Sequence, residues 1–317
     1  MSSKLKNIIS KGTFLLVLIF VLIYIKDTDF KALLEIQVNY WFISGVTLLI
    51  LTSRFIMPFA WQEIIYQFEG KKIDSIDLLY IYAKSWMGRY IPGKIVWVGG
   101  KISMSMDKGI SKLTAVMASF IDSIFQIFSG FLIGLLSLVN IKYITDNGVR
   151  PEMVFVLIAI SLIFITPTVF NKVTGAVYSF TKKKRFEKQH HLTWTTLIKS
   201  NGIIIFSKMI GALLLPMMVI AFGIEVSFLD FIYLMGVFSL SGAIGMAAFF
   251  APAGLGVTEA VQIILLTPII PKEYIISMVI IRRVVTIICD VLFYIICFIL
   301  DKLKYNFSIN HGDNYNN

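Results

Sequence analysis

Acidic residues, cysteine and histidine are scarce in this chain of 317 residues. Charged residues make up only 15% of it and hydrophobic residues 57%, with a mean hydropathy of +0.81, whereas a soluble domain usually has about 25% charged residues. This composition excludes an ordinary soluble protein. The net charge of +10 reflects a shortage of acids, 19 against 29 basic residues, which argues against a nucleic-acid partner and indicates contact with a membrane surface.

The few cysteines and histidines are placed where they cannot form a metal site. Cys289 and Cys297 fall in the last apolar segment, whereas His190, His191 and His311 lie in polar stretches. We therefore expect no metal and no cofactor. The sequence also lacks a nucleotide-binding Gly-x-x-x-x-Gly-Lys-Ser/Thr loop and a nucleophile elbow, so we predict that the chain is not an enzyme.

Long apolar runs predict an all-α polytopic integral membrane protein with about eight crossings, because one crossing takes about 20 residues. The uninterrupted runs span residues 14–25, 40–60, 113–139, 153–170, 202–222, 228–250 and 274–300. Two further runs, 78–100 and 251–270, are shorter and are interrupted by proline and glycine. We treat residues 1–317 as one membrane domain that can be divided into the halves 1–170 and 202–317.

The distribution of lysine and arginine between the loops predicts the orientation in the cell membrane, because cytoplasmic loops carry the basic excess. The N-terminus is basic, and segment 171–201 contains seven basic residues and one acid, so both are expected to be cytoplasmic. Four uninterrupted runs before residue 171 already give an even number of crossings. The segment around Arg89 should therefore enter the membrane and return on the cytoplasmic side. The weakly basic C-terminal tail predicts that the segment after Pro252 crosses.

The first interrupted segment places two cations beside a helix break. Arg89 and Lys94 flank Pro92 and Gly93, and a helix rarely continues through such a pair because proline lacks a backbone donor and glycine is conformationally free. Cations beside free N–H groups are typical of an anion site. Alternatively, both side chains lie at the cytoplasmic interface and extend to lipid headgroups.

The second interrupted segment places a carboxylate after a glycine-rich turn. Pro252, Gly254 and Gly256 precede Glu259 in an otherwise apolar region. A charged residue at the centre of a membrane helix costs about 2.5–3.5 kcal/mol by insertion scales, which makes Glu259 a functional candidate. Glu259 either pairs with a buried arginine or takes up and releases a proton.

Other charged and polar residues interrupt the apolar runs. Arg282 and Arg283 lie in the last run, where Asp290 falls on nearly the same helical face as Arg283. Polar residues at spacings of three, four and three form a stripe that should face the bundle interior: Ser119, Asp122, Gln126 and Ser129. Lys208 is expected to extend to the membrane interface.

Each half of the chain contains one interrupted segment. Matched broken helices in two halves are typical of the central site of a transporter. The alternative is that proline and glycine are simply more frequent in membrane helices.

The two interrupted motifs together resemble those of the lysylphosphatidylglycerol synthase transmembrane-region family, also called flippase-like membrane proteins. The family's Arg-x-hydrophobic-Pro-Gly signature is matched within Arg89-Tyr-Ile-Pro-Gly-Lys94-Ile-Val-Trp97. Its Pro-x-Gly-hydrophobic-Gly-x-x-Glu signature is matched within Ala251-Pro-Ala-Gly-Leu-Gly-Val-Thr-Glu259, and Arg282-Arg283 follows. Ala253 stands where many members have a further glycine. The resemblance extends over most of the chain.

The resemblance implies a role in moving a lipid across the membrane, as in the lipid-flipping domains of the multiple peptide resistance factors. Bifunctional members continue into a soluble aminoacyltransferase domain, so this chain is similar to the stand-alone members. We predict a translocase for a phospholipid or a polyprenyl-phosphate lipid, whose phosphate is held by Arg89, Lys94 and one of Arg282 or Arg283. The alternative is a non-catalytic scaffold for lipid-modifying or glycan-biosynthesis enzymes.

Transport against a gradient needs a driving force, which an intramembrane carboxylate supplies if it is charged in one conformation and neutral in another. Glu259 is the first candidate for this coupling because a flexible turn precedes it, and Asp122 is the second. In the alternative, Glu259 only neutralises Arg282 or Arg283 and transport ignores pH.

Overall fold

The computed structural model describes residues 39–91, 95–138, 151–172, 175 and 191–312, and every element in these ranges is a helix. Five of the described helices are long and apolar enough to cross a membrane. The predicted fold class is therefore confirmed, whereas the count of about eight crossings is not. The first predicted crossing, 14–25, and most of segment 171–201 lie outside the described residues.

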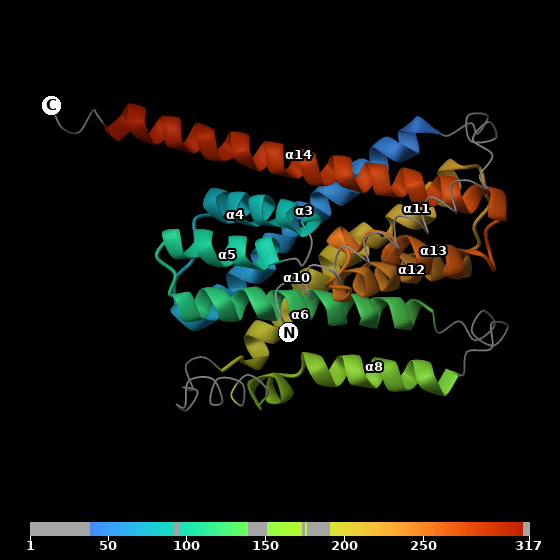
Figure 1. Ribbon diagram of the computed structural model, residues 1–317, viewed down its shortest axis with the longest axis horizontal. Helices are drawn as coiled ribbons and strands as arrows, with labels where there is room; N and C mark the ends of the chain where they lie inside the picture. The colour runs from blue at the N-terminus through green and yellow to red at the C-terminus, as the bar shows by residue number, and fades with distance from the viewer. Residues whose placement is uncertain (1–38, 92–94, 139–150, 173–174, 176–190, 313–317) are drawn as a thin grey trace, which may run out of the picture.

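The elements are α3 (Tyr40–Glu69), α4 (Ser75–Met87), η1 (Gly88–Tyr90), α5 (Ile95–Asp107), α6 (Lys112–Ser137), α8 (Pro151–Ile165), α10 (Trp194–Ala212), α11 (Leu214–Ala221), α12 (Phe228–Ala247), η3 (Pro252–Gly254), α13 (Val257–Leu266) and α14 (Lys272–Gly312). Polar caps begin several of them: the side chains of Asn39, Ser111 and Thr193 accept backbone N–H groups at the start of α3, α6 and α10. α14 has 41 residues, about 60 Å at 1.5 Å per residue, and extends beyond the bundle (Figure 1).

Polar contacts identify which helix ends lie together. At one end, which we call the Asp77 end, Lys108 Nζ and Lys304 Nζ lie 2.8 and 3.0 Å from the two carboxylate oxygens of Asp77. At the other, the Ala221 end, the N–H of Asn39 donates to the carbonyl of Ala221 over 3.1 Å. α3, α6, the α10–α11 pair and α14 run between these two ends.

α4 and α5 form a hairpin that enters from the Asp77 end and returns to it. Each helix has 13 residues, about 20 Å, which is less than the roughly 30 Å of a hydrocarbon core. Asp77 near the start of α4 pairs with Lys108 just after α5, so both ends of the hairpin lie on the same side. The structure therefore confirms the predicted return of the segment around Arg89.

α12 and α13 form a second hairpin, which enters from the Ala221 end. Tyr233 Oη, early in α12, donates to the carbonyl of Leu265, late in α13, over 2.9 Å, so the two helices are antiparallel. α13 has only ten residues, about 15 Å, which is too short to cross. The segment after Pro252 therefore returns the chain to the side from which α12 entered, as predicted, but α13 is too short for the full crossing that the prediction assumed.

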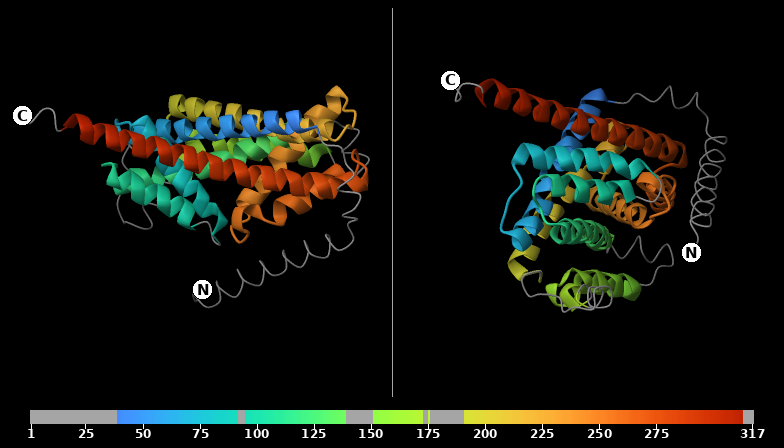
Figure 2. Two further views of the ribbon diagram at one scale, coloured as in Figure 1. Left: turned by 90° about the horizontal axis from the view of Figure 1, so that it is seen from above. Right: turned by 60° about the vertical axis from the view of Figure 1, so that its left-hand side comes forward.

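The tips of the two hairpins meet in the middle of the bundle. Figure 1 shows α4 and α5 in one half of the molecule and α12 and α13 in the other, and the left view of Figure 2 shows the same separation. η1 and η3, which form the tips, contact each other. One hairpin comes from each half of the chain, which is the arrangement expected of a transporter with matched broken helices.

Apolar side chains form one cluster toward each end. The first lies around Trp61, Tyr82 and Phe125 near the Asp77 end, and the second lies around Leu214 and Met278 near the Ala221 end. The buried Arg282 and Asp290 of α14 lie near the hairpin tips, where they pair with Glu259 and with Arg54 and Arg89. The fold thus places a polar layer in the centre of an apolar bundle.

The hairpin topology predicts the outcome of cysteine labelling in intact cells. Lys108→Cys and Lys302→Cys should react from one side of the membrane, and Glu225→Cys and Thr267→Cys from the other, because each pair lies at one end of the bundle. Both native cysteines are buried, so their background labelling should be low. Labelling of Thr267→Cys from the same side as Lys302→Cys would contradict a returning second hairpin.

Candidate functional site

A cavity of about 150 Å³ lies where the hairpin tips meet. Five cationic side chains line it: Arg54 from α3, Arg89 from η1, Lys208 from α10, and Arg282 and Arg283 from α14. The predicted binding residues Arg89, Arg282 and Arg283 are thus brought together, although about 190 residues separate the first from the others along the chain. The remaining predicted ones, Lys94 with the break residues Pro92 and Gly93, lie outside the described residues.

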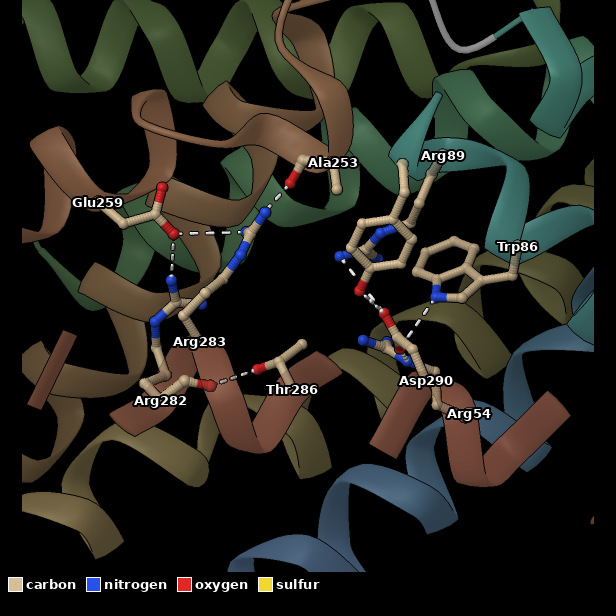
Figure 3. Close-up of polar contacts among 10 residues, drawn as sticks. Arg54, Trp86, Arg89, Ala253, Glu259, Arg282, Arg283, Thr286 and Asp290 are labelled. Atoms are coloured by element: carbon tan, nitrogen blue, oxygen red, sulfur yellow. Dashed lines mark hydrogen bonds and ion pairs between the residues drawn. The ribbon is translucent and has the colours of Figure 1, made fainter. Parts of the chain in front are cut away.

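Asp290 anchors the first group of charges beside the cavity. Its Oδ1 accepts from Arg54 Nε over 2.8 Å and from Trp86 Nε1 over 3.0 Å, and its Oδ2 accepts from Tyr90 Oη over 2.7 Å. Arg89 Nη2 lies 3.6 Å from the same Oδ2. Asp290 is fully buried. Its carboxylate pairs with two arginines that come from different helices (Figure 3).

Trp86 fills the space between the two arginines of this group. The guanidinium carbons of Arg54 and Arg89 lie 4.9 and 4.5 Å from its ring centroid, close enough for cation–π attraction. The stacking holds both cations near the cavity while their remaining donors stay available. Trp86 is the last residue but one of α4, so the tip of the first hairpin positions this group.

Glu259 anchors the second group of charges. Its Oε1 lies 2.8 Å from Arg282 Nη2 and 3.3 Å from Arg283 Nη1, and its Oε2 accepts the backbone N–H of Gly256 over 2.7 Å. Arg283 Nη1 also donates to the carbonyl of Ala253 over 3.2 Å, which ties α14 to the tip of the second hairpin (Figure 3). Glu259 was expected either to pair with an arginine or to take up and release a proton. In this conformation it pairs with Arg282 and Arg283.

The second hairpin turns sharply because three residues at its tip adopt left-handed backbone conformations. Gly254 and Gly256 have φ of 70° and 78°, and Ala253 has φ of 49°. Such values favour glycine, so the alanine at position 253 is accommodated at a cost of about 1–2 kcal/mol. The predicted break at Pro252, Gly254 and Gly256 is confirmed. The first hairpin is also interrupted, since Ile91 after η1 is extended.

Gly245 allows the second hairpin to close, and its replacement by alanine should destabilise the protein. A Cβ at Gly245 would lie 2.0 Å from Thr258 Oγ1 and 3.4 Å from the Cα of Gly254, so the hairpin would have to open. We expect a loss of about 1–3 kcal/mol of stability from such overpacking, seen as a lower unfolding temperature in detergent. Gly242→Ala is the matched control, because a Cβ there meets nothing within 4 Å. Equal unfolding temperatures for the two variants would contradict this account.

Asp122 belongs to a separate buried network beside the cavity. It forms an ion pair with Lys101, and both side chains are fully buried. Gln126 Nε2 donates to Asp122 Oδ2 over 2.9 Å, and the Lys101 ammonium lies 5.0 Å from the ring centroids of both Tyr82 and Trp97. The predicted stripe of α6 therefore faces the interior, and its carboxylate is balanced by one lysine.

Three buried or cavity-lining cations differ from the sequence-based expectation. Lys208 lines the cavity, so its predicted extension to the interface is wrong. Arg54 and Lys101 were not predicted at all, although Arg54 lies inside the apolar run 40–60, where a cation is a signal of burial. Arg283 and Asp290 do lie on α14 as a pair two turns apart, yet each binds different partners, because the hairpin tips supply nearer ones.

The family model described as Lysylphosphatidylglycerol synthase TM region matches residues 8–293. The chain belongs to this family. No curated protein matches the chain. The match covers both hairpins and the charged part of α14.

Proposed function

We propose that this family member is a lipid translocase, which passes an anionic lipid headgroup through the central cavity while the acyl chains stay in the bilayer. The observation that supports this most is the concentration of five cations around one cavity in the middle of an apolar bundle. Buried cations are costly unless an anion compensates them, and a lipid phosphate is the anion most available in a membrane.

The two hairpins offer a route by which such a site is exposed to each side in turn. One hairpin covers the cavity toward the Asp77 end and the other toward the Ala221 end. Movement of either tip would open the site to one side while the other tip keeps it closed, which is the general scheme of alternating access. We propose no enzymatic step and place the protein in the cell membrane, with the N-terminus and segment 171–201 in the cytoplasm.

Reconstitution tests the proposal directly. Liposomes containing the purified chain should exchange fluorescent phospholipids between leaflets, measured by chemical quenching of the outer leaflet. Arg89→Gln should slow exchange by about tenfold or more, because a charge-assisted contact worth 1.4 kcal/mol or more is lost. Lys199→Gln removes an exposed lysine of α10 outside the cavity and should leave the rate unchanged.

The rival function is a scaffold for lipid-modifying or glycan-biosynthesis enzymes. It requires no passage of lipid, so Arg89→Gln would then act only on assembly. If the wild-type chain never accelerates exchange of any labelled lipid, and a partner enzyme co-purifies with it, the translocase proposal is wrong and the scaffold stands.

A further inference from the structure

We infer that the cavity recognises a headgroup with at least two negative charges, namely a terminal phosphate monoester or a diphosphate, and that Lys208 determines this preference. This inference rests on the proposed function, since it names the class of lipid that the site accepts. A phosphodiester with one charge, or a zwitterionic headgroup, would leave the site incompletely neutralised.

The positive charges around the cavity outnumber the negative ones. Its four arginines remain protonated under all ordinary conditions. Only two carboxylates pair with them, Asp290 and Glu259, so two positive charges stay uncompensated by the described residues. Lys208 adds a third. The buried Lys101–Asp122 pair is neutral as a unit and does not change this balance.

Several guanidinium N–H donors of the arginines that line the cavity have no acceptor. Arg89 Nε, Arg283 Nε and Arg283 Nη2 are buried and have no hydrogen-bond partner among the described residues. Unsatisfied donors on buried charged groups are expensive, and guanidinium groups match the oxygens of a phosphate in geometry. A group that offers several charged oxygens satisfies these donors better than one that offers two.

Lys208 lines the same cavity as the arginines. No hydrogen bond or ion pair joins its ammonium group to another described residue, although it lines the cavity. The ammonium group lies beside Gly130 of α6, since a Cβ there would lie 3.4 Å from Lys208 Nζ. α10 thus adds to the cavity lining one cation that no described residue pairs with, and this cation is available to a second negative charge of a ligand.

The same charges disfavour headgroups that carry a cation. An ammonium group of a zwitterionic lipid would enter a cavity lined by five cations, where like charges repel strongly in a low-dielectric surrounding. Specificity then arises from repulsion of the wrong headgroup as well as from attraction of the right one.

Binding of short-chain lipids with identical tails tests the inference. The full chain in detergent would be titrated by calorimetry with dihexanoyl phosphatidic acid, phosphatidylglycerol and phosphatidylcholine at about pH 7, where a monoester with a second pKa of about 6 is mostly a dianion. We expect phosphatidic acid to bind about tenfold more tightly than phosphatidylglycerol, and phosphatidylcholine to bind most weakly.

Lys208→Gln supplies the residue-specific test, because this lysine has no described partner whose loss would disturb folding. The variant should reduce the preference for phosphatidic acid over phosphatidylglycerol to about twofold, whereas Lys199→Gln should leave it unchanged. Equal affinities for the three lipids, tighter binding of phosphatidylglycerol, or an unchanged preference in Lys208→Gln would each overturn the inference.

Leaflet exchange of long-chain lipids distinguishes this inference from the proposed function. Selective binding that depends on Lys208, with no exchange of any lipid, would contradict translocation and leave the inferred recognition standing. Exchange of all three lipids at one rate, with equal binding, would support translocation and overturn the inferred headgroup class.

Discussion

Asp290→Asn should lower stability by about 3–5 kcal/mol, since removing one partner of a buried ion pair leaves the other charge uncompensated. Asp290 accepts hydrogen bonds from Arg54, Trp86 and Tyr90 and is fully buried. Asparagine keeps the shape of the side chain and removes its charge. We expect a much lower unfolding temperature in detergent and less folded protein after size-exclusion chromatography.

Two variants make this prediction specific. Asp301→Asn removes a partly exposed carboxylate of the same helix and should change stability little. Adding Arg54→Gln to Asp290→Asn should recover part of the loss, because one of the cations left unpaired is then removed. A loss as large in Asp301→Asn, or a double variant that is less stable by the sum of both single losses, would show that the charge pair is not the cause.

The sequence indicated that the charges of α14 and of the second motif do not face lipid. Arg282, Arg283 and Glu259 are charged residues in apolar runs, and such residues face protein or water because lipid cannot solvate them. Arg54 is likewise a charged residue in an apolar run, 40–60, and its burial follows from the same rule. Which charge pairs with which could not be predicted, because the pairing depends on contacts between helices far apart in the chain.

Hydropathy alone could not predict how deep the second hairpin reaches. α12 has 20 residues and a composition that suits a crossing. What makes it half of a hairpin is the contact of Tyr233 with Leu265 and the short length of α13. Loop charges could not distinguish the two topologies, because two half-crossings return the chain to the same side as two full crossings do.

Lys208 illustrates a different limit. A lysine near one end of an apolar run is compatible with the membrane interface and with the interior, because its long side chain reaches in either direction. The choice depends on neighbours on other helices, such as Gly130 of α6, which lies beside the ammonium group. No local pattern around position 208 contains that information.

Glu259→Gln should separate the two roles predicted for this carboxylate. The variant can still accept the N–H of Gly256 and so preserve the start of α13, while Arg282 and Arg283 lose their charged partner. If Glu259 binds and releases a proton in each cycle, wild-type exchange should depend on pH, and the variant should be slower and insensitive to pH. Leaflet exchange of fluorescent lipid at several pH values measures both effects.

Asp122→Asn is the comparison that identifies the coupling residue. Asp122 is balanced by the fully buried Lys101, so its loss should lower stability without removing a pH dependence that originates at the cavity. Glu259 lies between two arginines beside the hairpin tip, where movement of the tip would change its partners and thus its affinity for a proton. A Glu259→Gln variant with full activity and the pH profile of the wild type would eliminate Glu259 as the proton carrier and leave it the role of neutralising the arginines.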